Sequence, residues 1–372
     1  MSDTRASTTA LVGLAGLAVA LYAATEGSLS PIPARAFERK TQAVRLMQQW
    51  EAAILAAKRE RGIAIDRKND PDGSGLIGPQ FTLITTDRGS QSAKSLAAHP
   101  NFAAAVTDML VRAGVGRDDL VAVGMTGSLP GLNLAVLSAC AAVGAEPIII
   151  TSVGSSMFGA TDPDMTWLDM EAVLRKRTEF RCHSSAASLG GGGDVGRGLS
   201  PQGRQLLTDA IRRNGVKLLD SESLLDAVRE RVDLYDRDSA LRHKKIAAYV
   251  NVGGGLASLG GAPNARLIPS GFTSRLAERN YPNRGVLNIF AERGAPIIHL
   301  LQVEQLARLT GVTDDSDQPY RTGEGPLFVS YRYNLWAVGG SLVLILGANA
   351  VVLRRDVRHR MMGRPHPERT NA

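Results

Sequence analysis

Three short stretches rich in Gly, Ser, Thr and Asn hold the residues of this chain that are best suited to bind a ligand. Each stretch follows a predicted β-strand, and ligands of open parallel sheets bind beyond the carboxyl ends of the strands. Small residues at these ends let the backbone approach a ligand closely, so we expect the three stretches to form one site. The candidate ligand-binding residues are Thr126, Gly127, Ser128, Asn133, Ser152, Ser155, Ser156, Asn251, Gly253 and Gly254.

Ser128 can be interpreted in three ways. It precedes a predicted helix with Pro130 in its first turn, so its hydroxyl would simply cap that helix. Alternatively, the free amides of residues 126–128 and the helix dipole would hold a carboxylate or a phosphate. In the third interpretation Ser128 is a catalytic nucleophile, and His183 is the best-placed histidine to act as its base. The surrounding turn is not G-x-S-x-G, so that motif gives the third interpretation no support.

A cluster of acidic residues follows at positions 162–171. Its carboxylates could bind a metal ion or transfer protons, but Thr166 and Asp169 have the spacing of a capping box. Acidic residues also suit the positive end of a helix dipole. Helix capping is therefore the favoured interpretation, and we predict no metal site.

Two glycine patterns fit G-x-G-x-x-G only loosely. The pattern at residues 191–196 has the spacing but follows no clear strand. The pattern at residues 253–258 follows a strand, but Ser258 replaces its third glycine. Both are weak signals for a dinucleotide, and we predict that the protein uses no cofactor.

Strand and helix patterns alternate through the middle of the chain. This alternation predicts an α/β fold with a mainly parallel, Rossmann-like sheet that is covered by helices on both faces. The glycine-rich segment 184–198 is predicted to be a flexible loop. Strands are predicted at 81–86, 120–123, 147–151, 216–219, 246–252 and 296–301, and helices at 34–61, 101–114, 132–143, 166–175, 202–214 and 221–232.

An uncharged apolar run lies near each end of the chain, at residues 6–25 and 335–353. Each run is long enough to cross a hydrocarbon core of about 30 Å as a helix. The first run could also be a signal peptide, although it lacks a basic start and a small-x-small cleavage pattern. We expect an N-terminal transmembrane helix (1–25), an α/β domain (26–334) whose first helix (34–61) lies near the membrane, a second transmembrane helix (335–353) and a basic tail (354–372).

The basic residues next to the apolar runs predict the orientation. The tail has six arginines against one aspartate and one glutamate, whereas Arg5 and Asp3 balance each other in the N-terminal flank. Basic flanks remain in the cytoplasm, and two spans place both ends of the chain on the same side. We therefore expect both termini in the cytoplasm and the domain on the outer, extracytoplasmic side.

The formal net charge of +7 resides mainly in the tail, so the domain is only mildly basic. This argues against a nucleic-acid partner and is compatible with an acidic polymer or an anionic membrane surface. Cys140 and Cys182 could pair in an oxidising compartment, but Cys140 lies in a small, apolar helical stretch where a thiol usually packs. The sequence leaves the disulfide open.

Four motifs of the domain resemble those of one bacterial family. They are Gly75 to Gly78 with Ile84 to Thr86, Asn101 to Ala104, Val123 to Ser128 with Leu132 and Asn133, and Ser152 to Ser156 with Thr166 to Glu171. Through these motifs the chain resembles, over most of its length, the poly-gamma-glutamate system protein family. The resemblance implies a membrane-anchored accessory role in the bacterial machinery that makes and exports poly-γ-glutamate, beside a Mur-ligase-like synthetase and membrane subunits. It implies no catalytic residues.

The leading hypothesis from the sequence is an accessory protein of the bacterial inner membrane that binds poly-γ-glutamate or partner subunits outside the cytoplasm. Its partners would be the membrane, the anionic polymer and other membrane subunits of the same system. The alternative is an extracytoplasmic γ-glutamyl hydrolase or transferase with Ser128 as nucleophile. A third option is a structural subunit whose spans hold the complex together.

Overall fold

The computed structural model describes residues 8–180 and 182–362, and the chain divides into two compact units. The first unit combines the two ends of the chain, up to Pro33 and from Val329 onward. The second unit comprises Ala34–Phe328 and contains the α/β domain.

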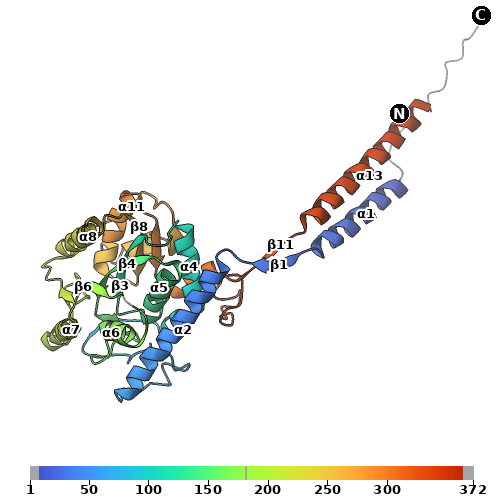
Figure 1. The fold of residues 1–372 in the computed structure, drawn as a ribbon. Coiled ribbons are helices and arrows are strands. Elements are labelled where there is room, and N and C mark those ends of the chain that lie inside the picture. The colour runs from blue at the N-terminus through green and yellow to red at the C-terminus, as the bar shows by residue number, and fades with distance from the viewer. Residues whose placement is uncertain (1–7, 181, 363–372) are drawn as a thin grey trace, which may run out of the picture. The chain divides into compact units, whose positions relative to one another are not determined.

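Two long apolar helices dominate the first unit. Helices α1 (Thr8–Glu26) and α13 (Leu335–Met362) lie side by side (Figure 1), and strands β1 (Ser30–Pro33) and β11 (Val329–Arg332) pair antiparallel. The segments Thr8–Glu26 and Leu335–Arg354 are each long and apolar enough to cross a membrane, and neither is buried within the fold. An exposed apolar surface of this length is suited to a lipid environment.

Helix α13 continues past the predicted end of the second span. The sequence places the start of a basic tail at residue 354, whereas the helix runs to Met362. Arginine has a high helix propensity, and no glycine or proline occurs between Arg354 and Met362 to stop the helix. The first part of the predicted tail is therefore helical.

A seven-stranded sheet forms the centre of the second unit. Its strands follow the order β7-β6-β4-β3-β8-β10-β9, and every neighbouring pair is parallel except β10 and β9. The predicted α/β class and mainly parallel sheet are thereby confirmed. The strands are β3 (Leu120–Thr126), β4 (Glu146–Ser152), β6 (Ser184–Ser188), β7 (Lys217–Leu218), β8 (Ile246–Val252), β9 (Gly271–Thr273) and β10 (Ile297–Leu300).

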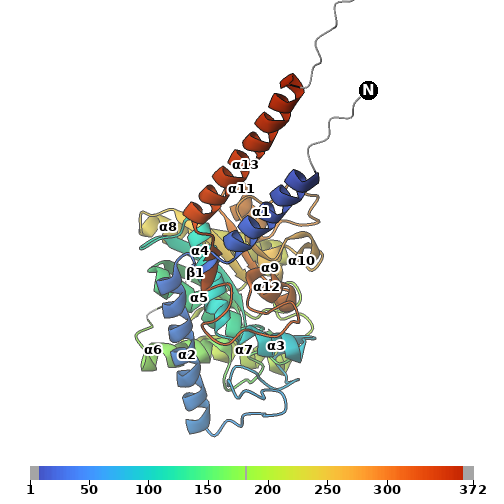
Figure 2. The same cartoon turned by 90° about the vertical axis from the view of Figure 1, so that its right-hand side faces the viewer.

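Helices cover both faces of this sheet, so its central strands are buried. All seven residues of β3 are buried, as expected for a parallel strand between two helical layers. One face packs against α8, α9 and α11, where the rings of Tyr235, Tyr249 and Phe290 contact one another. The other face packs against α5, which lies next to α4 and α2 (Figure 2). These helices are α2 (Phe37–Glu60), α4 (Asn101–Arg112), α5 (Pro130–Val143), α8 (Leu224–Leu241), α9 (Leu256–Leu259) and α11 (Val286–Glu292).

Helix α2 confirms the predicted helix at residues 34–61. Its apolar stripe is formed by Val44, Met47, Trp50 and Ile54, all of which are buried. Phe37, at the first position of the same stripe, is 39% exposed. Helix α2 packs against α4, α5 and α6 (Trp167–Arg177), so it belongs to the body of the domain.

Two segments differ from the sequence prediction. The segment 81–86, predicted as a strand, contributes only its end to the short strand β2 (Thr85–Asp87), and Phe81 is 67% exposed. The segment 184–198, predicted as a flexible loop, begins with β6, whose Ala186 and Ala187 are fully buried. Strand propensity reflects how well a residue fits a half-buried surface. It therefore predicts a strand wrongly for the exposed apolar run 81–86, and it misses the buried strand of small residues at the start of 184–198. The remaining elements are β5 (Ser155–Ser156), α3 (Gln91–Ala97), α7 (Pro201–Arg213), α10 (Asn264–Leu267) and α12 (Val303–Thr310).

Cys140 and Cys182 are both free. Cys140 lies inside α5, and Cys182 lies half-buried just before β6. Burial raises the pKa of each thiol, so both stay protonated near neutral pH and Cys140 packs as a small apolar side chain.

The strand order reverses between β3 and β8. From β3 the chain adds β4, β6 and β7 on one side, and it then returns to add β8 and β10 on the other. The connections after β3 and β8 therefore lead away in opposite directions. In sheets of this kind the carboxyl ends of the two strands border a ligand-binding crevice.

Candidate functional site

A cavity of about 650 Å³ lies at the carboxyl edge of the sheet, where the strand order reverses. Its walls come from the loops that follow β3, β4, β6, β8 and β10, together with residues between 86 and 94. The three predicted loops meet at this site because parallel strands place their carboxyl ends at the same edge. The residues of the predicted set that line it are Thr126, Ser128, Ser152, Ser156, Gly253 and Gly254.

A buried lysine that was not predicted from the sequence lies in the wall of this cavity. Lys94 belongs to α3 and is only 6% exposed. Its Nζ donates to the carbonyl oxygen of Ser128 and, over 2.8 Å, to Ser156 Oγ, and no carboxylate of the described residues pairs with it. Burial without a counter-charge disfavours the charged form and lowers the pKa of Lys94 to about 7. At neutral pH Lys94 therefore populates both its charged and its neutral form.

Ser128 and Ser156 are linked through the backbone. The amide of Ser156 donates to Ser128 Oγ over 3.0 Å, and Ser128 N donates to Thr126 Oγ1 over 3.3 Å. The N-cap position of α5 is occupied by Leu129, which provides no side-chain cap. The helix-capping interpretation of Ser128 is therefore wrong, because its hydroxyl accepts the amide of Ser156 instead.

A buried ion pair contributes one of its members, Asp194, to the wall of the cavity. Arg231 Nη2 of α8 and Asp194 Oδ2 of the loop after β6 are 2.5 Å apart, and the two side chains are 4% and 1% exposed. Ser152 Oγ donates to Asp194 Oδ1 over 2.7 Å, and Arg231 Nη2 donates to Ser188 Oγ over 2.8 Å. The pair therefore joins the loops after β4 and β6 to α8, and it neutralises the charge of Asp194.

Asn133 and Ser155 lie behind the lining of the cavity. Asn133 is fully buried, and its Nδ2 donates to the carbonyl oxygen of Thr126 over 2.9 Å. Ser155 is also fully buried, and its hydroxyl donates to the carbonyl oxygen of Ser156 over 2.8 Å. Both predicted residues hold the loops after β3 and β4 in place, and neither presents a surface to the cavity.

Asn251 and His299 form a buried polar pair on β8 and β10. Asn251 Nδ2 lies 2.9 Å from His299 Nδ1 and donates to the carbonyl oxygen of Gly253 over 2.8 Å. Burial lowers the pKa of His299 to about 4, so its imidazole is neutral and Nδ1 accepts from the amide. His299 is thus a buried histidine of the core, and Asn251 orients the loop after β8.

The predicted pairing of Ser128 with His183 is wrong. His183 comes directly before the five-residue strand β6, whose first residue Ser184 pairs with Ile149 in the middle of β4, whereas Ser128 follows the carboxyl end of β3. A strand of that length spans roughly 16 Å, so His183 lies well away from the carboxyl edge at which Ser128 lies. The sequence does not reveal this position, because the small residues of β6 (SSAAS) resemble a loop. Among the described residues that line the cavity there is no histidine.

Thr166 and Asp169 form the predicted capping box at the start of α6. Thr166 N and Thr166 Oγ1 donate to Asp169 Oδ2 over 2.8 and 2.6 Å. Burial opposes ionisation of Asp169, but hydrogen bonds from Arg213, Thr166 and Asn214 lower its pKa. The acidic cluster therefore stabilises a helix terminus, and no group of three potential metal ligands occurs in the part of the chain that the structure describes.

Gly127 allows the loops after β3 and β4 to pack closely against each other. A Cβ at this position would overlap the carbonyl oxygen of Val153, whereas a Cβ at Gly254 would meet no atom. We expect Gly127→Ala to lower the free energy of unfolding by about 1–3 kcal/mol, the usual cost of overpacking. Gly254→Ala should change it by less than about 0.5 kcal/mol. Urea unfolding of both full-length variants in detergent measures the difference. Equal losses of unfolding free energy in the two variants would mean that the loop after β3 moves aside to accommodate the added methyl group.

No local sequence signal marks Lys94 or Arg231 as part of a site. Each lies in a polar helix, where a basic residue usually faces solvent. Asp194 does have a signal, because it is the single acidic residue of the glycine-rich segment 184–198. A charge in such a segment is a reasonable candidate for an interaction within the fold.

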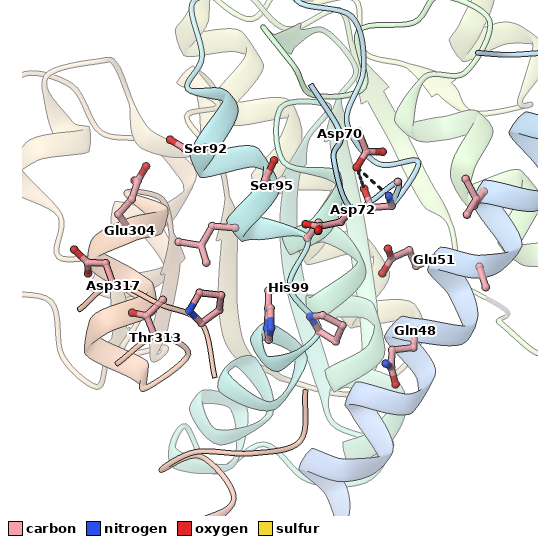
Figure 3. A pocket seen from close by; sticks show the side chains of 18 of the residues that line it. Gln48, Glu51, Asp70, Asp72, Ser92, Ser95, His99, Glu304, Thr313 and Asp317 are labelled. Carbon is pink, nitrogen blue, oxygen red and sulfur yellow. Dashed lines mark hydrogen bonds between the residues drawn. The ribbon is translucent and has the colours of Figure 1, made fainter. Parts of the chain in front are cut away.

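A second cavity, of about 860 Å³, lies between α2, α3 and α12 and is acidic. Burial and the charges of Asp70 and Asp72 raise the pKa of Glu51 in its wall to about 7. Carboxylates so close together repel an anionic ligand, so this cavity does not suit an anion. Figure 3 shows Glu51, Asp70 and Asp72 on one side of it and Glu304 and Asp317 on the other.

Comparison with known proteins gives no match: no family model, no curated protein and no solved structure matches this chain. Function is therefore inferred from the cavity at the carboxyl edge of the sheet. That cavity combines a buried lysine that has only neutral partners with hydroxyl groups and closely approaching backbone. Such a set of donors suits an anionic ligand.

Proposed function

We propose that this protein is a membrane-anchored accessory subunit of a bacterial system that makes or exports an anionic polymer such as poly-γ-glutamate. It would bind carboxylates of the polymer in the cavity at the carboxyl edge of the sheet. The sheet would then be a Rossmann-like platform whose loops hold the ligand. The sequence motifs support the choice of system, and the buried Lys94, which donates only to neutral oxygens, supports the choice of ligand.

One observation carries this proposal: the ammonium group of Lys94 is buried and donates only to neutral oxygens among the described residues. A buried cation without a counter-charge is unfavourable. A carboxylate that enters the cavity would supply the counter-charge and accept a charge-assisted hydrogen bond, which is stronger than a neutral one. Binding of a carboxylate would therefore offset the cost of burying Lys94.

Charged groups at the rim allow more than one carboxylate to bind. Arg88 and Arg197 line the cavity and are exposed, so they can contact neighbouring carboxylates of the same polymer. Asp87 and Glu304 lie on the same rim and oppose this attraction. The main contact is therefore the one at Lys94, and the rim arginines add a weaker, salt-dependent attraction.

The terminal unit would anchor the protein in the bacterial inner membrane. In this proposal α1 and α13 cross the membrane, both termini lie in the cytoplasm and the α/β domain lies outside it. The arginines that follow the second apolar segment support this orientation. The spans would also contact other membrane subunits of the same system, and an extracytoplasmic domain would meet no nucleic acid.

Binding of poly-γ-glutamate of defined length to the full-length protein in detergent tests the proposal. We expect Lys94→Met to weaken binding at least about tenfold, because it removes a charge-assisted hydrogen bond. Lys245→Met is the matched control, since it removes an exposed lysine that does not line the cavity. The wild-type affinity should also fall as the salt concentration rises.

Isothermal titration calorimetry provides the affinities, and a fully esterified polymer shows whether free carboxylates are needed. Tight binding of the ester would contradict recognition of carboxylates. Wild-type protein that binds no polymer, or equal losses in Lys94→Met and Lys245→Met, would refute the site at Lys94.

A further inference from the structure

Ser156 and Lys94 have the geometry of a nucleophile and its base. Ser156 Oγ lies 2.8 Å from Lys94 Nζ, within the range over which a general base accepts a proton. Both residues line the cavity of about 650 Å³, and Ser156 is only partly buried, so a ligand can reach its hydroxyl.

Ser128 has a different relation to the lysine. Lys94 contacts Ser128 only at its backbone carbonyl oxygen, which cannot become a nucleophile. Ser128 Oγ accepts the amide of Ser156 over 3.0 Å, and no described residue accepts its hydroxyl proton. That proton is therefore available to a ligand atom close to Ser156.

We propose that Ser156 is a nucleophile, Lys94 its general base and Ser128 the donor that stabilises the oxyanion, and that together they cleave an amide bond beside a carboxylate. The substrate class is a γ-glutamyl chain, so this inference rests on the proposed function and adds a reaction to it. It also moves the nucleophile from Ser128, the residue named in the alternative hypothesis from the sequence, to Ser156.

The reaction has two steps. Ser156 Oγ attacks the carbonyl carbon of the amide, and its proton passes to the neutral Lys94 Nζ. The carbon–nitrogen bond then breaks while Lys94 gives that proton to the leaving amine, which leaves an ester between Ser156 and the acyl half of the chain. Water next attacks the ester carbon and gives a proton to Lys94. Ser156 Oγ leaves and recovers this proton, so the serine and the neutral lysine are restored.

The surroundings of Lys94 suit a general base. A lysine accepts a proton only from its neutral form, and burial lowers the pKa of Lys94 to about 7. Serine–lysine pairs of this type replace the histidine of the serine–histidine arrangement. The other charged groups that line the cavity are Asp87, Arg88, Asp194, Arg197 and Glu304.

Hydrolysis of poly-γ-glutamate of defined length by the full-length protein in detergent tests the inference. Chain length is followed by gel filtration, and the ester intermediate by a mass increase on the peptide that contains Ser156. We expect Ser156→Ala and Lys94→Arg each to lower the rate about 100-fold or more. Arginine keeps the positive charge but stays protonated, so Lys94→Arg should still bind the polymer.

Two controls separate chemistry from folding. Ser274→Ala removes an exposed serine outside the cavity and should keep the wild-type rate. Ser156→Ala should bind the polymer as tightly as the wild type, which shows that its cavity is intact. The wild-type rate should rise between pH 6 and pH 8 as Lys94 loses its proton, a dependence that a purely structural lysine would not produce.

Wild-type protein that binds the polymer but never shortens it between pH 6 and pH 9 would overturn the inference and leave the proposed function in place. Shortening that persists in Ser156→Ala would also overturn it, because another group would then be the nucleophile. Wild-type protein that shortens the polymer by way of an ester on Ser156 would support it. Failure of the wild type to bind any polymer is the separate result that refutes the proposed function.

Discussion

Replacement of Arg231 by methionine is expected to lower the free energy of unfolding by about 3–5 kcal/mol, the cost of leaving one partner of a buried ion pair alone. The substitution leaves the carboxylate of Asp194, whose side chain is 1% exposed, without its cation. It also removes the hydrogen bond to Ser188 Oγ. Methionine has a similar aliphatic length, so most of the loss would come from the charge.

A double-mutant cycle separates the charge from the shape of the side chain. Adding Asp194→Asn to Arg231→Met removes the uncompensated charge, and we expect it to restore about 1–3 kcal/mol. Asparagine tolerates the left-handed φ of 69° that Asp194 adopts. Urea unfolding of the full-length protein in detergent measures the energies, with the buried Trp50 and Trp167 as fluorescent reporters of the α/β unit.

The control for this experiment is an exposed ion pair. Arg212 pairs with Asp209, and its side chain is 72% exposed, so Arg212→Met should cost less than about 1 kcal/mol. A similarly small loss for Arg231→Met would mean that water reaches Asp194 and that the pair does not hold the cavity loops together.

The stability difference between Lys94→Met and the wild type is expected to change by about 4 kcal/mol with pH. The pKa of Lys94 falls from its ordinary value of 10.5 to about 7 in the folded protein. Between these values the unfolded chain binds a proton that the folded chain does not, so wild-type stability rises with pH. Below pH 7 the cost of burying the charge is present in full. Lys94→Met lacks this cost, so its advantage is largest below pH 7 and declines towards pH 10.5.

Unfolding midpoints of the two proteins at pH 6.5, 8 and 10 in the same detergent measure this linkage. Lys245→Met should show no such change relative to the wild type, because Lys245 is exposed. A difference that is independent of pH would mean that Lys94 keeps its ordinary pKa, which would also remove its role as a base. A variant that is more stable at neutral pH yet binds no polymer would identify Lys94 as a residue retained for function.

The buried strands at the centre of the sheet are predictable from the sequence. Strands β4 and β8 contain the runs PIIIT and IAAYVNV, and strands that are buried on both faces have continuous apolar sequences. Strand β6 is not predictable in this way, because its sequence SSAAS is small and polar. It is a strand because β4 and β7 pair with its two edges, and these partners are far away in the sequence.

The place of the candidate site was also predictable, but its chemistry was not. Any residues that follow β3, β4 and β8 must meet at one edge of a parallel sheet, and Ser128, Ser156 and Gly254 do so. The hydroxyl that contacts Lys94 depends on β5, which pairs with β2 and places Ser156 beside Asp87. Such pairing between short strands leaves no pattern in either segment.

The sequence by itself determined the α/β class, the two apolar terminal helices and the edge of the sheet at which the predicted loops gather. These features follow from local periodicity and from the direction of parallel strands, so each segment carries its own signal. Only the tertiary structure decided that Lys94 is buried among neutral oxygens, that Arg231 pairs with Asp194 and that His183 lies away from the carboxyl edge. Burial and charge pairing depend on which distant segments pack together, and no single segment contains that information.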